Sequence, residues 1–304
     1  MSVELKGKRI LVTGPTGQVA RPLVAALAQH NEVFGLARFS KAEDREAIES
    51  LGAKVLQADL ADAASLSVVP EDVDYVLNFA VVKSGDFEYD LAANAEGVGN
   101  LMMRCRNAKA FLHFSSTAVY EYVGQEPRAE NAPLGDNHRV MFPTYSISKI
   151  AAETVCRFVA HQHKIPTTIA RLSVPYGDNG GWMYFHMLMM QQGIAIDLHP
   201  DKPNYYNPLH VDDYIAKIPY LLGAATPEVT TMNFGGSQKV SIEEWCAYIS
   251  ELTGFEPKFK DNPKAFGSLC IDTTKMHALI GETRVDWRDG VLRQMQKLAP
   301  QLLR

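Results

Sequence analysis

Short apolar runs alternate with amphipathic stretches through the first half of the chain. The apolar runs fall at residues 8–14, 32–38, 53–60, 73–80, 110–116 and 166–174, and the amphipathic stretches at residues 19–29, 41–52, 90–108 and 145–159. Runs of this kind are typical of strands buried on both faces of a sheet, whereas the amphipathic stretches follow the helical period. The alternation predicts an α/β fold with a doubly wound parallel sheet of about six strands.

The alternation stops after Val174. Residues 176–206 are rich in glycine, methionine and aromatic residues, and helices are expected from Asp212, over residues 241–254, and twice more near the C-terminus. We therefore expect a doubly wound domain over residues 1–173 and a smaller, mostly helical substrate-binding lobe over residues 174–304. A segment near residues 205–236 is expected to return to the sheet of the first domain.

Glycines follow the first predicted strand at the point where a helix begins. The sequence TGPTGQVA places Gly14, Gly17 and Ala20 in the spacing G-x-x-G-x-x-A. Glycine lets the backbone turn sharply and approach a pyrophosphate that rests on the helix N-terminus. The glycine spacing alone is weak evidence, but its place between a strand and a helix predicts a Rossmann dinucleotide site, with Thr16 and Gln18 among its contacts.

The end of the second predicted strand favours NADP over NAD. An NAD site carries an acidic residue there, which accepts a hydrogen bond from the ribose 2′-hydroxyl. Ala37 takes that position, Arg38 follows it and Lys41 lies nearby. Because an arginine can pair with a 2′-phosphate through its planar fork of donors, we expect NADP as the cofactor and NAD as the alternative. Asp59, after the third strand, is expected to accept from the adenine amino group.

A tyrosine and a lysine four residues apart, Tyr145 and Lys149, open the helix over residues 145–159. Residues four apart lie on the same helix face. A charged Lys149 would favour the phenolate and lower the pKa of Tyr145, which is about 10 in a free tyrosine. Tyr145 could then exchange a proton with an alcohol or ketone oxygen near neutral pH. Such pairs are also common on helix surfaces, but the glycine turn and the sequence SSTAVY (residues 115–120) favour a catalytic pair.

Together these motifs resemble the extended short-chain dehydrogenase/reductases of the NAD-dependent epimerase/dehydratase family. The matching landmarks are TGPTGQVA, ADL, NFA, NAEGV, SSTAVY, YSISK, RLSVPYG, LHVDDY and NFGG, in an order that covers nearly the whole chain. The resemblance implies an enzyme in which Ser116 holds the substrate oxygen, Tyr145 exchanges its proton and Lys149 also binds the cofactor ribose. It implies further cofactor contacts at Leu60, Phe79, Ala80, Lys83, Asn94 and Val174. It also implies a homodimer packed through helices near residues 90–108 and 145–163.

Three departures from the family pattern bear on the reaction. Sugar dehydratases follow their catalytic threonine with Asp-Glu, where this chain has Thr117 and Ala118, so dehydration is disfavoured. Nucleotide-sugar epimerases carry an asparagine near the diphosphate and an arginine for the nucleotide, where this chain has Val174 and Tyr206. A site for two phosphates needs positive charge or helix N-termini. The departures therefore favour a less charged substrate.

Aromatic residues of the second half are expected to surround the substrate. The expected rim is Trp182, Tyr184, His186, Tyr205 and Tyr206, with Ser116, Thr117 and Val174 closer to the reacting atoms. Such a rim suits a substrate with apolar or aromatic parts, although methionines and aromatics at helical spacing equally form helix cores.

We expect an NADP-preferring oxidoreductase that interconverts a secondary alcohol and a ketone or aldehyde on a small organic molecule. The alternative within enzymes is a nucleotide-sugar epimerase with tightly bound NAD. A non-catalytic dinucleotide-sensing protein is the alternative of a different class. An intact set of Ser116, Tyr145 and Lys149 argues against the sensor, which has no need of a proton donor.

Composition limits the remaining possibilities. The net charge is −5 and no basic block occurs, so nucleic acid is not expected as a partner. No apolar run is long enough to span a membrane, and no signal-peptide pattern precedes the first strand, so we expect a cytoplasmic protein. The four cysteines are far apart and no cluster has metal-ligand spacing, so we expect reduced thiols and no metal site.

Overall fold

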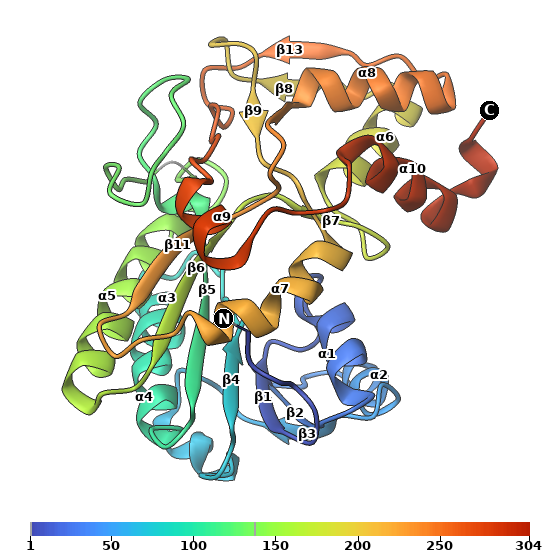
Figure 1. Ribbon diagram of the computed structural model, residues 1–304. Coiled ribbons are helices and arrows are strands. Elements are labelled where there is room, and N and C mark those ends of the chain that lie inside the picture. Colours follow the sequence, from blue (N-terminus) through green and yellow to red (C-terminus); the bar gives the residue numbers. More distant parts are fainter. Residues whose placement is uncertain (1, 137) are drawn as a thin grey trace.

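A seven-stranded parallel sheet forms the centre of the computed structural model, which describes residues 2–136 and 138–304 (Figure 1). Its strands are β1 (Arg9–Thr13), β2 (Glu32–Ala37), β3 (Lys54–Gln57), β4 (Tyr75–Asn78), β5 (Ala110–Ser116), β6 (Thr167–Leu172) and β11 (Thr230–Phe234). Their order is β11-β6-β5-β4-β1-β2-β3. The predicted doubly wound parallel sheet is confirmed. It has one strand more than expected from the first half because β11 adds to the edge beside β6.

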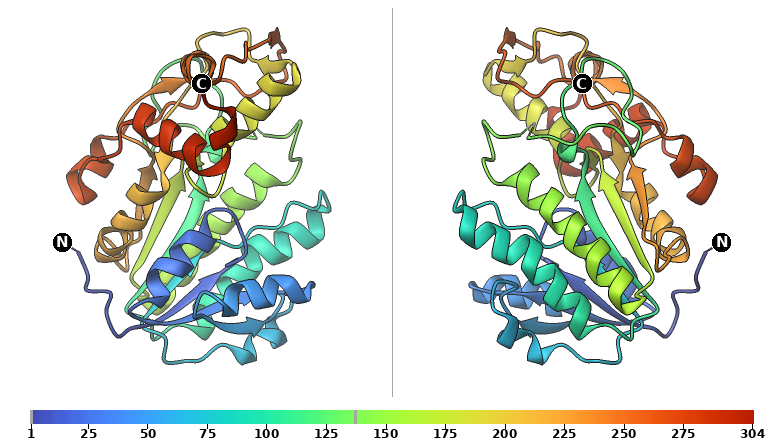
Figure 2. Two further views of the ribbon diagram at one scale, coloured as in Figure 1. Left: turned by 90° about the vertical axis from the view of Figure 1, so that its right-hand side faces the viewer. Right: turned by 90° about the vertical axis from the view of Figure 1, so that its left-hand side faces the viewer.

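Helices cover both faces of this sheet (Figure 2). On one face, α1 (Ala20–Ala28), α2 (Ala42–Glu49), α7 (Val211–Gly223) and α9 (Thr274–Ile280) share a hydrophobic core with the strands. On the other face, the 3-10 turn η1 (Ala63–Val68), α4 (Gly97–Arg104) and α5 (Tyr145–His163) share a second core. Because both faces are covered, the strands are apolar throughout, which is the pattern the sequence displays.

The helix expected over residues 90–108 begins earlier and is not uniform. It starts as α3 (Phe87–Leu91), where the Asp86 side chain accepts a hydrogen bond from Tyr89 N. It continues through a π-helical turn (Ala92–Glu96) into α4, which ends at Arg104. A Cβ on Gly97 would lie 2.4 Å from the Leu60 carbonyl oxygen, so α4 approaches the end of β3 closely. Turns of π-helix within α-helices often mark functional sites.

The second half builds a lobe with its own core at one end of the sheet (Figures 1 and 2). Its helices are α6 (Trp182–Gln192), α8 (Ile242–Thr253) and α10 (Trp287–Leu298), followed by the 3-10 turn η4 (Pro300–Leu302). Its short strands pair as β7 (Pro175–Tyr176) with β10 (Leu209–His210), β9 (Tyr205–Tyr206) with β12 (Val240–Ser241), and β8 (Ile196–Leu198) with β13 (Phe259–Asp261). The capping box of Ser241 and Glu244 fixes the start of α8.

A buried ion pair ties α5 to the sheet. Arg171 donates to Glu153 through Nη2 (2.8 Å to Oε2) and Nε (2.9 Å to Oε1), and the two side chains are only 2% and 0% exposed. The hydroxyl of Ser115 donates to the same carboxylate at 2.6 Å. Burial acts to raise the pKa of Glu153, but the hydrogen bonds from Arg171 and Ser115 hold that pKa below its usual value. One carboxylate therefore joins β5, β6 and α5.

Replacing Glu153 with alanine should destabilise the protein by about 3–5 kcal/mol, because Arg171 is left as a buried and unpaired charge. Urea unfolding at neutral pH measures this change. Glu49→Ala is the matched control, since Glu49 pairs with Arg45 on the exposed surface of α2 and such pairs contribute about 0–1 kcal/mol. Equal loss of stability in the two variants would contradict the role given to the buried pair.

Candidate active site

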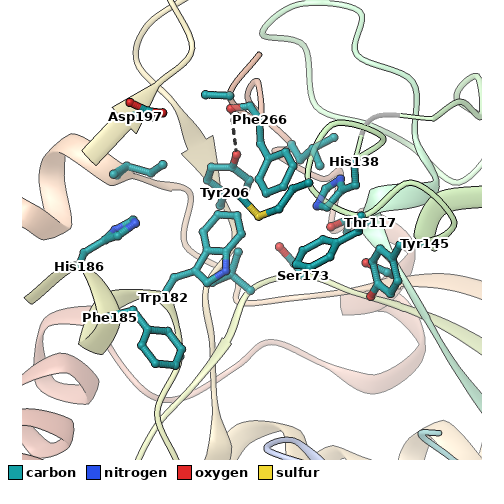
Figure 3. Close-up of a pocket in the computed structure, with 18 of the residues that line it drawn as sticks. Thr117, His138, Tyr145, Ser173, Trp182, Phe185, His186, Asp197, Tyr206 and Phe266 are labelled. Atoms are coloured by element: carbon teal, nitrogen blue, oxygen red, sulfur yellow. Dashed lines mark hydrogen bonds between the residues drawn. The ribbon is translucent and has the colours of Figure 1, made fainter. Parts of the chain in front are cut away.

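A cavity of about 820 Å³ lies where the carboxyl ends of β5 and β6 meet the C-terminal lobe (Figure 3). The glycine turn after β1 contributes Gln18 and Val19 to its lining. The ends of β5 and β6 contribute Ser116 and Val174, and α5 contributes Tyr145. Ligands of doubly wound sheets bind outside the carboxyl ends of the strands, so the cavity lies where this fold places its chemistry.

Ser116 and Tyr145 lie close together because β5 ends near the point in space where α5 begins. Ser116 is the last residue of β5 and accepts a hydrogen bond from Ala118 N at 3.1 Å in the 3-10 turn η3 (Thr117–Val119). Tyr145 is the first residue of α5. Burial raises the pKa of Tyr145 above its usual value, and a hydrogen bond with the Ser116 hydroxyl acts in the opposite direction. The pair presents two hydroxyl groups at one end of the cavity.

Lys149 lies one helical turn farther along α5 and is 4% exposed. Its ammonium group donates to the Phe114 carbonyl oxygen of β5 at 2.7 Å. Burial lowers the pKa of Lys149 to about 8. The expected lowering of the Tyr145 pKa by Lys149 does not occur in this arrangement, because burial of the phenol dominates and the ammonium group is directed at the strand backbone.

A second lysine faces Tyr145 from the loop after β4. Lys83 Nζ lies 5.4 Å from the ring centroid of Tyr145 and 4.4 Å from that of Phe142, and Lys83 lines the cavity. Cations are attracted to the faces of aromatic rings at such distances. The resemblance had placed Lys83 among the cofactor contacts. Its position in the cavity lining, beside Tyr145, is compatible with a contact there.

The glycine turn suits a pyrophosphate. Gly14 has φ +62°, and a Cβ on this residue would lie 3.0 Å from Ala80 Cα, so a side chain is excluded. Within residues 2–136 and 138–304, the amide N–H groups of Thr16, Gln18 and Val19 find no hydrogen-bond acceptor, and no side chain caps α1. Free N–H groups at the N-terminus of a helix are the usual donors to phosphate oxygens. These residues could hold the diphosphate of NAD or NADP.

At the expected adenosine end, Tyr89, which no sequence pattern indicated, links Arg38 to Asp59. Arg38 donates to the Tyr89 hydroxyl at 3.0 Å, and that hydroxyl donates to Asp59 Oδ2 at 2.9 Å. Tyr89 belongs to α3, whose start was expected three residues later, which is why no pattern pointed to it. The guanidinium group of Arg38 is exposed at the edge of the sheet.

The remaining expected cofactor contacts lie around the end of β4. Asn94 accepts from Val82 N at 2.7 Å and donates to Val82 O at 2.8 Å, so its amide holds the loop that carries Lys83. Phe79 stacks on Phe114 with ring centroids 3.8 Å apart. Leu60 lies against Gly97, and Ala80 lies against Gly14. Val174 lines the cavity.

Aromatic side chains form the wall of the cavity opposite the sheet (Figure 3). His138 stacks on Phe266 with ring centroids 3.9 Å apart, and Phe266 lies nearly parallel to Trp182 at 5.9 Å. Tyr206 is 1% exposed and donates to the Gly267 carbonyl oxygen at 3.0 Å. Among the described residues, Lys and Asp/Glu side chains reach the lining only at Lys83, Asp197 and Lys264. The wall is therefore apolar over most of its length.

Three members of the expected rim line the cavity and two do not. Trp182, His186 and Tyr206 line it, as does Thr117. Tyr184 and Tyr205 do not line it, and Tyr205 instead packs beneath Lys239. Tyr184 lies two residues from Trp182 and from His186 on α6, and residues two apart on a helix point to different sides. Tyr205 is next to Tyr206 on β9, and neighbours on a strand point to opposite faces. No sequence pattern pointed to His138 or Phe266, which lie in irregular segments.

Two further features concern metals and membranes. Within the described part of the chain, no group of three or more His, Cys, Asp or Glu side chains could hold a metal ion. No helix among the described residues combines the length and the apolar character needed to cross a bilayer. The four cysteines are buried and free.

Residues 10–235 match the sequence profile of the NAD dependent epimerase/dehydratase family. The chain belongs to this family. Its members are enzymes of the extended short-chain dehydrogenase/reductase type, so the expected resemblance is confirmed. Among curated proteins, human dTDP-D-glucose 4,6-dehydratase is 21% identical over 95% of this chain and 89% of its own. An uncharacterised UDP-glucose epimerase of Bacillus subtilis is 26% identical over 78% of each chain.

Solved structures of the family share the whole fold. UDP-glucuronic acid 4-epimerase from Bacillus cereus, in complex with UDP-glucuronic acid and NAD, superposes with a TM-score of 0.78 at 19% identity, covering 96% of this chain and 99% of its own. UDP-glucose 4-epimerase from Thermotoga maritima, with UDP-glucose, gives a TM-score of 0.80 at 20% identity, covering 97% and 99%. At such identity the likeness establishes the fold.

The lowered pKa of Lys149 predicts how cofactor affinity changes with pH. If the ammonium form binds the ribose hydroxyls, affinity is complete below about pH 8 and falls as the pH rises through the pKa of Lys149. Fluorescence titration with NADPH between pH 6 and about 9.5 measures the change. Lys149→Met should bind more weakly at every pH and lose this dependence. A wild-type affinity that stays constant to the upper limit would contradict the assignment.

Proposed function

We propose that this family member is an NAD(P)-dependent oxidoreductase that interconverts a secondary alcohol and a ketone or aldehyde on a small, largely uncharged substrate. The observation that carries the proposal is the cavity itself. The hydroxyl groups of Ser116 and Tyr145 lie at one end of the cavity, and aromatic side chains form its wall. Among the described residues that line it, only three are Lys, Asp or Glu. Apolar walls with a few polar groups at one point are typical of sites for small organic ligands.

When bound, the cofactor supplies or accepts hydride at C4 of its nicotinamide. In reduction, the Tyr145 hydroxyl donates a hydrogen bond to the substrate carbonyl oxygen and then transfers its proton to it. The Ser116 hydroxyl donates to the same oxygen and holds it in place as negative charge develops. In oxidation, Tyr145 takes the proton back. A phenol whose pKa is raised by burial is protonated at neutral pH, so the resting protein presents an acid suited to carbonyl reduction.

The same lining weakens the case for a nucleotide-sugar substrate, which the names of the relatives favour. Tyr206, at the position of the epimerase arginine, is a buried phenol already bonded to the Gly267 carbonyl oxygen. Val174, at the position of the asparagine near the diphosphate, is apolar and 8% exposed. A diphosphate would therefore depend on the lysines at the cavity and on helix N-termini. Dehydration also lacks its acid and base, since Thr117 and Ala118 follow Ser116.

The preference for NADP rests on Arg38. Ala37 cannot accept from a ribose 2′-hydroxyl, whereas the exposed guanidinium group of Arg38 lies at the adenosine end of the site, within a hydrogen bond of Tyr89. A 2′-phosphate there would gain charge-assisted hydrogen bonds. The solved relatives named above that carry a dinucleotide carry NAD, so the cofactor choice needs its own measurement.

Assembly and location stay predictions from the sequence. A homodimer through α4 and α5 would cover Phe158, which is 65% exposed on α5. Exposed aromatic side chains of this size are common in interfaces.

Replacing Tyr145 with phenylalanine should reduce turnover of 4-acetylbiphenyl with NADPH by about 10²–10⁴-fold, because the proton donor is removed. The affinity for NADPH should change little. Turnover is followed by loss of NADPH, and affinity by fluorescence titration. Tyr184→Phe, on α6 but outside the cavity lining, is the matched control and should retain activity. An active Tyr145→Phe variant would overturn the mechanism.

Replacing Arg38 with alanine should weaken NADPH binding by about 10- to 100-fold, the value of hydrogen bonds to a charged group, and leave NADH binding unchanged. Isothermal titration with both cofactors measures the two affinities. Arg45→Ala, which removes an exposed arginine of α2 that pairs with Glu49, is the control for a general loss of positive charge. An equal effect of Arg38→Ala on both cofactors would contradict the NADP preference.

A further inference from the structure

His186 lines the cavity, and one of its two ring nitrogens already accepts a hydrogen bond from another side chain. The indole Nε1–H of Trp245 donates to His186 Nδ1 at 2.9 Å. The planes of the two rings are inclined by 24°, and their centroids lie 5.8 Å apart. Trp245 is 0% exposed in the core of the lobe and does not line the cavity. The bond is thus shielded from solvent.

This bond fixes the tautomer of His186. An indole N–H can only donate, so Nδ1 must accept and cannot carry a proton. The single proton of the neutral imidazole is therefore on Nε2. Burial lowers the pKa of His186 to about 4, so the ring stays neutral near pH 7. The second ring nitrogen is accordingly a permanent hydrogen-bond donor rather than a group that switches with pH.

The donor belongs to a residue that lines the cavity. Nε2 lies on the side of the imidazole ring away from Trp245, and His186 lines the cavity. Across residues 2–136 and 138–304, Nε2 makes no hydrogen bond, and it does not belong to the fully buried polar atoms that lack a partner. Figure 3 shows His186 and Tyr145 on opposite sides of the cavity, with Trp182 and Phe266 between them. Asp197 lies on the same side of the cavity as His186 (Figure 3), so the cavity has polar groups at both ends and rings in the middle.

We propose that His186 Nε2–H recognises an acceptor oxygen on the end of the substrate remote from the reacting carbonyl. The ligand class is an uncharged ring compound with an oxygen at each end, one held by Ser116 and Tyr145 and the other by His186. The identity of the reacting end rests on the proposed function, whereas the donor at His186 rests on its bond to Trp245.

A neutral acceptor such as a carbonyl, hydroxyl or ether oxygen suits this end best. His186 supplies one neutral donor and no positive charge, and its ring neighbours are Trp182 at 6.3 Å and Trp245. Burying an unpaired carboxylate against such rings would cost far more than one hydrogen bond returns. The donor of His186 therefore suits a neutral acceptor, in a cavity whose described lining has charged side chains only at Lys83, Asp197 and Lys264.

The first test needs no substrate. Protein labelled with ¹⁵N-histidine gives a two-bond ¹H–¹⁵N correlation spectrum in which the two neutral tautomers have different patterns, and the His186 signal is assigned by its loss in His186→Gln. We expect Nε2–H as the single form from pH 6 to about 8, and a mixture of tautomers in Trp245→Phe, which lacks the indole donor. A proton on Nδ1, or titration near the ordinary value of about 6.5, would overturn the proposal.

The second test measures recognition through binding alone. The probes are 4,4′-diacetylbiphenyl and 4-acetyl-4′-ethylbiphenyl, which differ only in the distal oxygen, and the readout is quenching of tryptophan fluorescence. We expect the diacetyl compound to bind about tenfold more tightly to the wild type, the value of one hydrogen bond, and the preference to vanish in His186→Phe. His186→Gln, which retains an acceptor for Trp245 and a donor, should keep part of the preference.

The two proposals fail in different ways. A preference in Tyr145→Phe equal to that of the wild type is expected, because that variant binds without turnover. Equal binding of the two probes by the wild type, or a preference that survives in His186→Phe, would overturn the role of His186. If the preference is as expected but neither probe is reduced with NADPH or NADH, the proposed function fails and the distal site stands.

Discussion

The active-site geometry depends on one buried carboxylate. Tyr145, Lys149 and Glu153 are spaced four residues apart, so they form a stripe on the face of α5 that meets the sheet. Glu153 fixes this face against Arg171 of β6 and Ser115 of β5. Ser115 precedes Ser116, so the contact that holds the helix also positions Ser116, the proposed partner of Tyr145 at the substrate oxygen. A shift of α5 along the sheet would break the hydrogen bonds of Glu153 and would also separate Tyr145 from Ser116.

Burial also shifts the charge states of Tyr145 and Lys149. It raises the pKa of Tyr145 and lowers that of Lys149, so each group is moved toward its neutral form. Positive charge reaches the cavity instead from Lys83, whose ammonium group lies over the Tyr145 ring. The phenol is thus protonated at neutral pH, and the aromatic wall opposite it is largely apolar. The proposal of a neutral carbonyl substrate rests on this balance.

The parts that follow local rules could be predicted from the sequence. Buried parallel strands require uninterrupted apolar runs, and the turn at Gly14 requires a glycine, so both features can be recognised in the sequence. The stripe from Tyr145 to Glu153 follows the helical period. The wall could not be assembled this way, since His138 and Phe266 are distant in sequence and lie in irregular segments. The bond from Trp245 to His186 joins residues 59 apart on different helices, and only tertiary packing brings them together.

The most direct test of the central claim is the identity of any nucleotide the protein carries. Purified protein is denatured, and the released nucleotide is identified and quantified by mass spectrometry. An enzyme that reduces one substrate after another must exchange its cofactor, so the account predicts little bound nucleotide, or NADP that is removed by dialysis. Near-stoichiometric NAD that survives purification and dialysis would contradict it, because a cofactor regenerated in place belongs to an epimerase.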